Sequence, residues 1–130
     1  MTDKPKGAEM IQLMNVRRGW DQLLVYVGPF STVLRFSSID KFRPGVVIFQ
    51  GLPVNLIKSM EGFLKKPEGT SLAQVSTPEG RILHMCIHQD PLFCILDLGD
   101  PDNPNVIHTI QLRREELQKL HDTLLSFWTC

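Results

Sequence analysis

The chain has little of what is typical of secreted or membrane-spanning proteins. Its 130 residues include three cysteines, Cys86, Cys94 and Cys130, without Cys-x-x-Cys spacing. An odd number of unpaired thiols predicts an intracellular protein, in the cytoplasm, nucleus or an organelle. No apolar run approaches the roughly 20 residues of a membrane-spanning helix, so we expect no membrane partner. Residues 1–9 carry lysines without the apolar segment of a secretory signal, and we expect a flexible tail there.

Signatures of catalysis and of cofactor binding are also missing. The sequence has no Gly-x-Ser-x-Gly elbow, no glycine-rich phosphate loop and no His-Glu-x-x-His motif. We therefore expect no enzyme activity and no cofactor. His84, Cys86 and His88 alternate along one predicted strand, and His108 could add a zinc ligand from another. Three such side chains span roughly 13 Å, which is too far for one tetrahedral ion, so we predict no metal site.

Net charge is zero, but the charge is divided unevenly along the chain. Residues 1–66 carry 10 basic and 5 acidic side chains, a balance of +5, whereas residues 67–130 carry 4 basic and 9 acidic, a balance of −5. This asymmetry indicates an anionic partner for the first half. Attraction between the two halves, within one chain or between two chains, would explain it as well.

Apolar and β-branched runs separated by turn residues predict the same order of elements twice. The first half has predicted strands at residues 10–16, 21–27, 31–39 and 46–50, then a helix at 54–66. The second half has predicted strands at residues 71–76, 81–89, 92–99 and 106–112, then a helix at 113–128. Each helix has an apolar stripe, Leu56, Ile57, Met60, Phe63 and Leu64 in the first and Leu117, Leu120, Leu124 and Phe127 in the second.

The two halves align without a gap at an offset of 60 residues. Matched pairs include Leu23 with Leu83, Pro44 with Pro104, Val46 with Val106, Leu52 with Leu112 and Leu64 with Leu124. A four-stranded sheet with one helix cannot complete a core alone, but two such units can share one. We therefore predict an α+β fold of two β-β-β-β-α repeats, each an antiparallel sheet with one helix. Residues 10–69 and 70–130 would form one compact domain, which we expect to dimerise.

The strand-to-helix junctions VVIFQGLPVNLIKSMEGFLKK and VIHTIQLRREELQKLHDTLLSF carry a resemblance to a known class. A tandem β-β-β-β-α duplication over roughly residues 10–128 resembles the PUR-repeat and Whirly-type single-stranded nucleic-acid-binding proteins. The kinetoplastid guide-RNA-binding proteins look similar. The resemblance is one of topology. It implies binding of single strands on sheet surfaces through basic and aromatic side chains, in dimers or tetramers.

Basic and aromatic residues of the first half would form such a surface. Cations neutralise phosphates and flat rings stack on bases. Strand alternation puts Tyr26 and Arg35 on one outer face, and Phe49 could join them, although the facing of its strand is ambiguous. The predicted nucleic-acid-binding residues are Arg17, Arg18, Trp20, Tyr26, Arg35, Lys41, Arg43 and Phe49.

A second hypothesis keeps the fold and changes the partner. The second face of each predicted sheet mixes apolar and polar residues, and a partly apolar surface of this kind usually contacts a binding partner. With zero net charge, the chain would then be a protein-interaction or assembly module that binds no nucleic acid.

Overall fold

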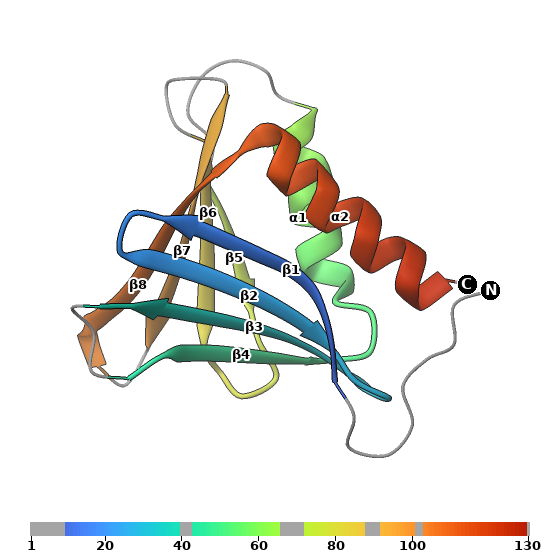
Figure 1. The fold of residues 1–130 in the computed structure, drawn as a ribbon, viewed down its shortest axis with the longest axis horizontal. Coiled ribbons are helices and arrows are strands. Elements are labelled where there is room, and N and C mark those ends of the chain that lie inside the picture. Colours follow the sequence, from blue (N-terminus) through green and yellow to red (C-terminus); the bar gives the residue numbers. More distant parts are fainter. Residues whose placement is uncertain (1–9, 40–42, 66–71, 88–91, 101–102, 130) are drawn as a thin grey trace.

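The computed structural model describes residues 10–39, 43–65, 72–87, 92–100 and 103–129. The first half of the chain is a four-stranded antiparallel sheet with its strands in chain order, followed by a helix (Figure 1). Its elements are β1 (Ile11–Arg18), β2 (Asp21–Val27), β3 (Ser31–Ser38), β4 (Gly45–Gln50) and α1 (Val54–Leu64).

The second half repeats this order with a second antiparallel sheet and a longer helix. The predicted α+β fold of two β-β-β-β-α repeats is therefore confirmed. In Figure 1 the strands of the first sheet run across the view, whereas those of the second run up it. The second set of elements is β5 (Leu72–Ser76), β6 (Ile82–Ile87), β7 (Phe93–Asp100), β8 (Asn103–Arg113) and α2 (Arg114–Thr129).

Both repeats bury their apolar residues in one core. Alternate residues of a strand point to opposite faces, and one face of each sheet is buried. The helices add their apolar stripes, and all of these residues belong to a single cluster. Its members include alternate residues of β2 and β6 and most of the two predicted stripes, namely Leu23, Val25, Val27, Leu83, Met85, Ile87, Leu56, Ile57, Met60, Phe63, Leu117, Leu120, Leu124 and Phe127.

Helix α2 belongs to the second repeat but is tied to the sheet of the first at both ends. In its first turn, Glu116 forms an ion pair with Arg18 at the end of β1. In its last turn, the indole N–H of Trp128 donates to the hydroxyl of Thr32 on β3, at 2.8 Å. The Glu116 carboxylate also accepts from the backbone N–H of Arg113 at 2.8 Å, as in a capping box. These links and the shared core hold the two repeats together.

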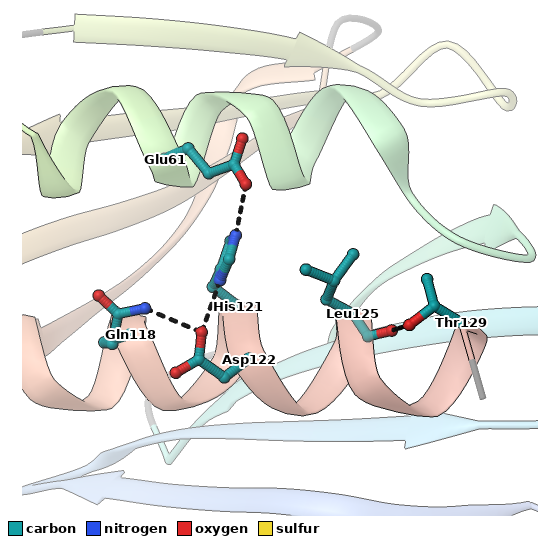
Figure 2. Close-up of polar contacts among 6 residues, drawn as sticks. All are labelled: Glu61, Gln118, His121, Asp122, Leu125 and Thr129. Atoms are coloured by element: carbon teal, nitrogen blue, oxygen red, sulfur yellow. Dashed lines mark hydrogen bonds and ion pairs between the residues drawn. The ribbon is translucent and has the colours of Figure 1, made fainter.

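The two helices lie side by side and exchange polar contacts (Figure 2). His121 of α2 contacts the Glu61 carboxylate of α1 through Nε2 and the Asp122 carboxylate through Nδ1, both at 2.8 Å. Glu61 and His121 stand 60 residues apart, so equivalent positions of the two repeats meet at this contact. Arg114 donates to the carbonyls of Phe63 and Leu64 in the last turn of α1, where carbonyls lack partners within the helix.

The exposed edge of the first sheet is covered by side chains of the second repeat. Strand β4 has β3 on one side only, which leaves its outer backbone groups without a strand partner. Glu79 accepts from the N–H of Ile48 at 2.8 Å, and Arg81 donates to the carbonyl of Val46 at 3.0 Å. Both residues come from the β5–β6 turn and its end, so the second repeat satisfies the edge of the first.

The gapless offset of 60 does not hold in the fourth strands. Val47 of β4 is fully buried, but Ile107, its counterpart at that offset, is 47% exposed on β8. The inward residues of β8 are instead His108, Ile110 and Leu112. Pairing between β7 and β8 shifts register by three residues between Gly99 and Asp100, and a shift by an odd number of residues turns every following side chain to the other face.

A close approach between the two sheets depends on Gly45. A Cβ atom at this position would lie 2.6 Å from Cδ2 of His108 and 2.8 Å from a methyl carbon of Leu98. We expect Gly45→Ala to lower the free energy of unfolding by about 1–3 kcal/mol, because an overpacked core must shift. Urea denaturation would measure this loss.

Gly62 provides the matched control. It lies in α1, and a Cβ there would meet nothing within 4 Å. Because alanine favours helices, Gly62→Ala should raise the free energy of unfolding, by up to about 1 kcal/mol. Equal effects of the two substitutions would contradict the close packing at Gly45.

The His121 contacts should make stability depend on pH. Burial alone would lower the pKa of His121, but hydrogen bonds to Asp122 and Glu61 outweigh it and raise that pKa above its usual 6.5. Hydrogen bonds from His121 and Gln118 lower the pKa of Asp122 from its usual 3.8. The imidazolium therefore stabilises the fold fully below pH 6.5, and this contribution is lost as pH rises through the raised pKa. The Asp122 contribution is lost at the acid end, as pH falls below 3.8 towards the lowered pKa.

We expect His121→Gln to cost about 1 kcal/mol of unfolding free energy near pH 5.5 and clearly less near pH 8.5. Chemical denaturation at the two pH values measures the difference. Lys119→Gln, on an exposed position of the same helix, is the control and should show no such pH dependence. A cost of His121→Gln that stays constant with pH would show that the imidazolium is not involved.

Candidate nucleic-acid interface

The outer face of the first sheet combines hydrogen-bonding, apolar and cationic side chains. Cross-strand pairing places Tyr26 beside Val33 and Val33 beside Ile48 in one row. The next row contains Leu24 and Arg35. Besides Arg35, the polar members of the outer face are Gln12, Asn15, Arg17, Gln22, Ser31, Ser37 and Gln50.

Two predicted residues supply the positive charge of this face. Arg17 on β1 and Arg35 on β3 are both exposed and point outward. Neither forms an ion pair with any residue in the described ranges. No carboxylate stands at an outward position of β1–β4 as described, and Glu79 reaches only the edge, at the N–H of Ile48. An anion can therefore approach this face without meeting a like charge.

Arg18 has a different role from its neighbour. Its guanidinium is ion-paired with Glu116 and also donates to the carbonyl of Arg17 at 2.7 Å. Its side chain is 29% exposed. The structure thus links Arg18 to α2, where it joins the two repeats. Sequence reasoning could not see this pair, because 98 residues separate its members.

Aromatic rings stand at both ends of the outer face. Trp20 lies in the β1–β2 turn and is 73% exposed, as a stacking platform must be. Tyr26 lies near the other end of β2 and is half-buried. Phe30, in the β2–β3 turn, is 81% exposed and was not among the predicted residues. An aromatic ring directly after the Gly28-Pro29 turn was the signal that could have identified it.

The remaining predicted residues do not extend the face. Phe49 is only 6% exposed and points into the core, so it does not join Tyr26 and Arg35. Its strand is apolar on both faces, and the opposite positions hold Val46 and Ile48. Arg43 is exposed just before β4, and Lys41 lies outside the described residues.

The outer face of the second sheet has a different character. His84, Asp97 and Thr109 form one cross-strand row, and the Thr109 hydroxyl donates to the Asp97 carboxylate at 2.6 Å. His108 is 6% exposed and faces the core, so it cannot join His84 and Cys86 around a metal. Among the residues that the structure describes, no group of three ligands could hold a metal ion.

The Cys94 thiol is not suited to nucleophilic chemistry. It is fully buried between the sheets, and burial raises its pKa to about 12. A thiol with this pKa carries almost no thiolate at neutral pH, and the thiolate is the reactive form.

Substitutions of the neighbouring residues Arg17 and Arg18 should differ in their effect on stability. We expect Arg18→Ala to lower the free energy of unfolding by about 1–3 kcal/mol, because it leaves Glu116 without its charged partner. Arg17→Ala should stay within about 0.5 kcal/mol of the unmodified protein. Urea denaturation of both variants tests this, and equal losses would show that the ion pair does not stabilise the fold.

Comparison with known proteins does not assign the chain to a family. No protein-family model matches the chain, and no curated protein matches it. Within the described ranges, no helix is long and apolar enough to cross a membrane. The function is therefore inferred from the fold and from the side chains on its surface.

Proposed function

We propose that this protein binds single-stranded DNA or RNA, without catalysis, on the outer face of β1–β4. The observation that carries the proposal is the pair of exposed arginines, Arg17 and Arg35, on a face whose described outward positions hold no carboxylate. Cations on such a face neutralise phosphates, and this term supplies most of the affinity for a nucleic acid. The resemblance to PUR-repeat and Whirly-type proteins supports the same proposal.

Single strands fit this surface better than a duplex does. Trp20 and Tyr26 stand at opposite ends of β2, about 20 Å apart along the strand at about 3.3 Å per residue. Each can stack on an unpaired base, and stacking is worth about 1–3 kcal/mol per base with little preference for sequence. Bases inside a duplex are already stacked and cannot reach these rings. Binding would therefore combine phosphate contacts at the arginines with stacking at the two ends of the sheet.

The decisive test is the salt dependence of binding. Fluorescence anisotropy with labelled oligo-dT and oligo-U, between roughly 50 and 200 mM salt, should show affinity that falls steeply as salt rises. On a single strand, each phosphate that the protein neutralises adds about 0.7 to the magnitude of the slope of log K against log salt. We expect Arg17→Ala/Arg35→Ala to weaken binding and to reduce the magnitude of this slope by about 1.4.

The control removes the same charge from another surface. Arg113, whose side chain is 61% exposed, and Lys119 on α2 lie outside the first sheet. Arg113→Ala/Lys119→Ala should leave the slope nearly unchanged. Absence of binding by either oligonucleotide at low salt would disprove the proposal. Equal losses of affinity in the two double variants would show that the binding site lies outside the outer face of β1–β4.

A protein partner is the second candidate for the same face. Leu24, Val33 and Val46 are half-buried on it, and Ile48 is 44% exposed. An apolar row of this kind suits a protein surface, including that of a second copy of the chain. Association that tolerates salt and is unaffected by Arg17→Ala/Arg35→Ala would favour this candidate.

A further inference from the structure

A groove lies where the first sheet meets the second. The β1–β2 hairpin ends over β8, and β8 contacts β1, β2 and β3 (Figure 1). One cavity of about 530 Å³ is lined there by Arg18, Gly19, Ile95 and Gln111, and a smaller one of about 180 Å³ by Ser37 and Ile107 among others. Asp21 and Thr109 line both. We call this pair of cavities the inter-sheet groove.

The inter-sheet groove is rich in hydrogen-bond acceptors. The Asp21 carboxylate forms no hydrogen bond or ion pair with the residues that the structure describes, so both its oxygens are available. The Thr109 hydroxyl gives its hydrogen to Asp97, which leaves only lone pairs for a ligand. The Gln111 amide can accept or donate. A ligand that bonds to both Asp21 and Thr109 must therefore present hydrogen-bond donors to them.

Charge in the inter-sheet groove opposes a phosphate. Among the described residues, the one cation that lines it is Arg18, and Glu116 already neutralises that guanidinium. Asp21 and the neighbouring Asp97 place two carboxyl groups at this point. The phosphates of a bound strand would stay on the outer face, at Arg17, which immediately precedes Arg18 on β1.

An exposed aromatic residue adjoins Asp21 in the chain. Trp20 follows Gly19 in the hairpin turn and is 73% exposed. Ile95 and Ile107 supply apolar surface in the groove itself. Stacking on an indole and hydrogen bonding to a carboxylate are how proteins hold an unstacked base.

We propose that the inter-sheet groove takes one base of the bound strand and, through the Asp21 carboxylate, selects the bases with an exocyclic amine, cytosine, adenine and guanine, over thymine and uracil. This rests on the proposed function and adds a base preference to it. A carboxylate accepts from the N4 amine of cytosine, whereas the O4 atom at the same position of thymine or uracil is an acceptor and would be repelled, which leaves only their N3–H to donate. A lysine or arginine of a protein partner would also satisfy Asp21, but it would not need Trp20, the preceding residue in the chain.

Cytosine and uracil make the sharpest comparison, because the rings are the same size and differ only in the group at position 4 and in the hydrogen on N3. We would measure anisotropy with oligo-dC and oligo-dU of about 12 nucleotides, within the usual range of single-strand site sizes. We expect oligo-dC to bind about 5-fold to 100-fold more tightly than oligo-dU. Asp21→Asn should bring the ratio of the two affinities to within about 2-fold, because an amide can donate to O4 as well as accept from N4.

Glu115→Gln is the matched control. It removes one negative charge from an exposed position, with the Glu115 side chain 77% exposed on α2. Any general gain in phosphate affinity should appear equally in both variants, and the dC to dU ratio should stay high in Glu115→Gln. A ratio near 1 in the unmodified protein, or a ratio that Asp21→Asn leaves unchanged, would overturn the groove assignment while leaving the proposed function standing.

Free nucleosides test the inter-sheet groove without a strand. In amide-detected NMR titrations, millimolar cytidine should shift the signals of Asp21 and Thr109, and uridine should shift them much less. If neither oligonucleotide binds at low salt, the proposed function is wrong. The nucleoside titration then tests by itself whether the inter-sheet groove binds a base. Equal shifts with both nucleosides, or none with cytidine, would count against it.

Discussion

Everything in this fold depends on the fact that each repeat is completed by the other. The α2 helix of the second repeat is held on the first sheet by the Arg18–Glu116 ion pair and by the hydrogen bond from Trp128 to Thr32. The helices meet at Glu61 and His121, at equivalent positions of the two repeats. Because all the apolar faces pack into one cluster, removing either half would expose the inner face of the other.

This shared construction leaves the outer sheet faces without a part in the core. The inner positions of the strands and the two helices already supply that core, so the outward residues can differ between the repeats. The first sheet carries Arg17 and Arg35 outward, whereas the second carries Asp97, hydrogen-bonded to Thr109. One fold, duplicated, therefore presents two chemically different surfaces, and the zero net charge of the whole chain conceals that difference.

Sequence patterns predicted the elements well because those patterns are local. Alternation in β2 and the 3–4 spacing in both helices report directly which side is buried, and the structure agrees at Leu23 and Leu117. The facing of Phe49 was not predictable, because β4 is apolar on both faces. The partner of Arg18 was not predictable either, since its ion pair joins residues 98 positions apart. The register shift next to Asp100 breaks the 60-residue offset at a point where the sequence shows only turn formers.

The protected edge of β4 has a consequence for the origin of the chain. Glu79 and Arg81, which satisfy its outer backbone groups, both come from the second repeat. A protein made of one repeat would leave that edge open to pairing with any extended chain, and it would need a second molecule to close it. Gene duplication with fusion converts such an obligatory pair of molecules into one polypeptide. It also lets each half diverge, so that one can keep a ligand surface while the other specialises in covering the edge of its neighbour.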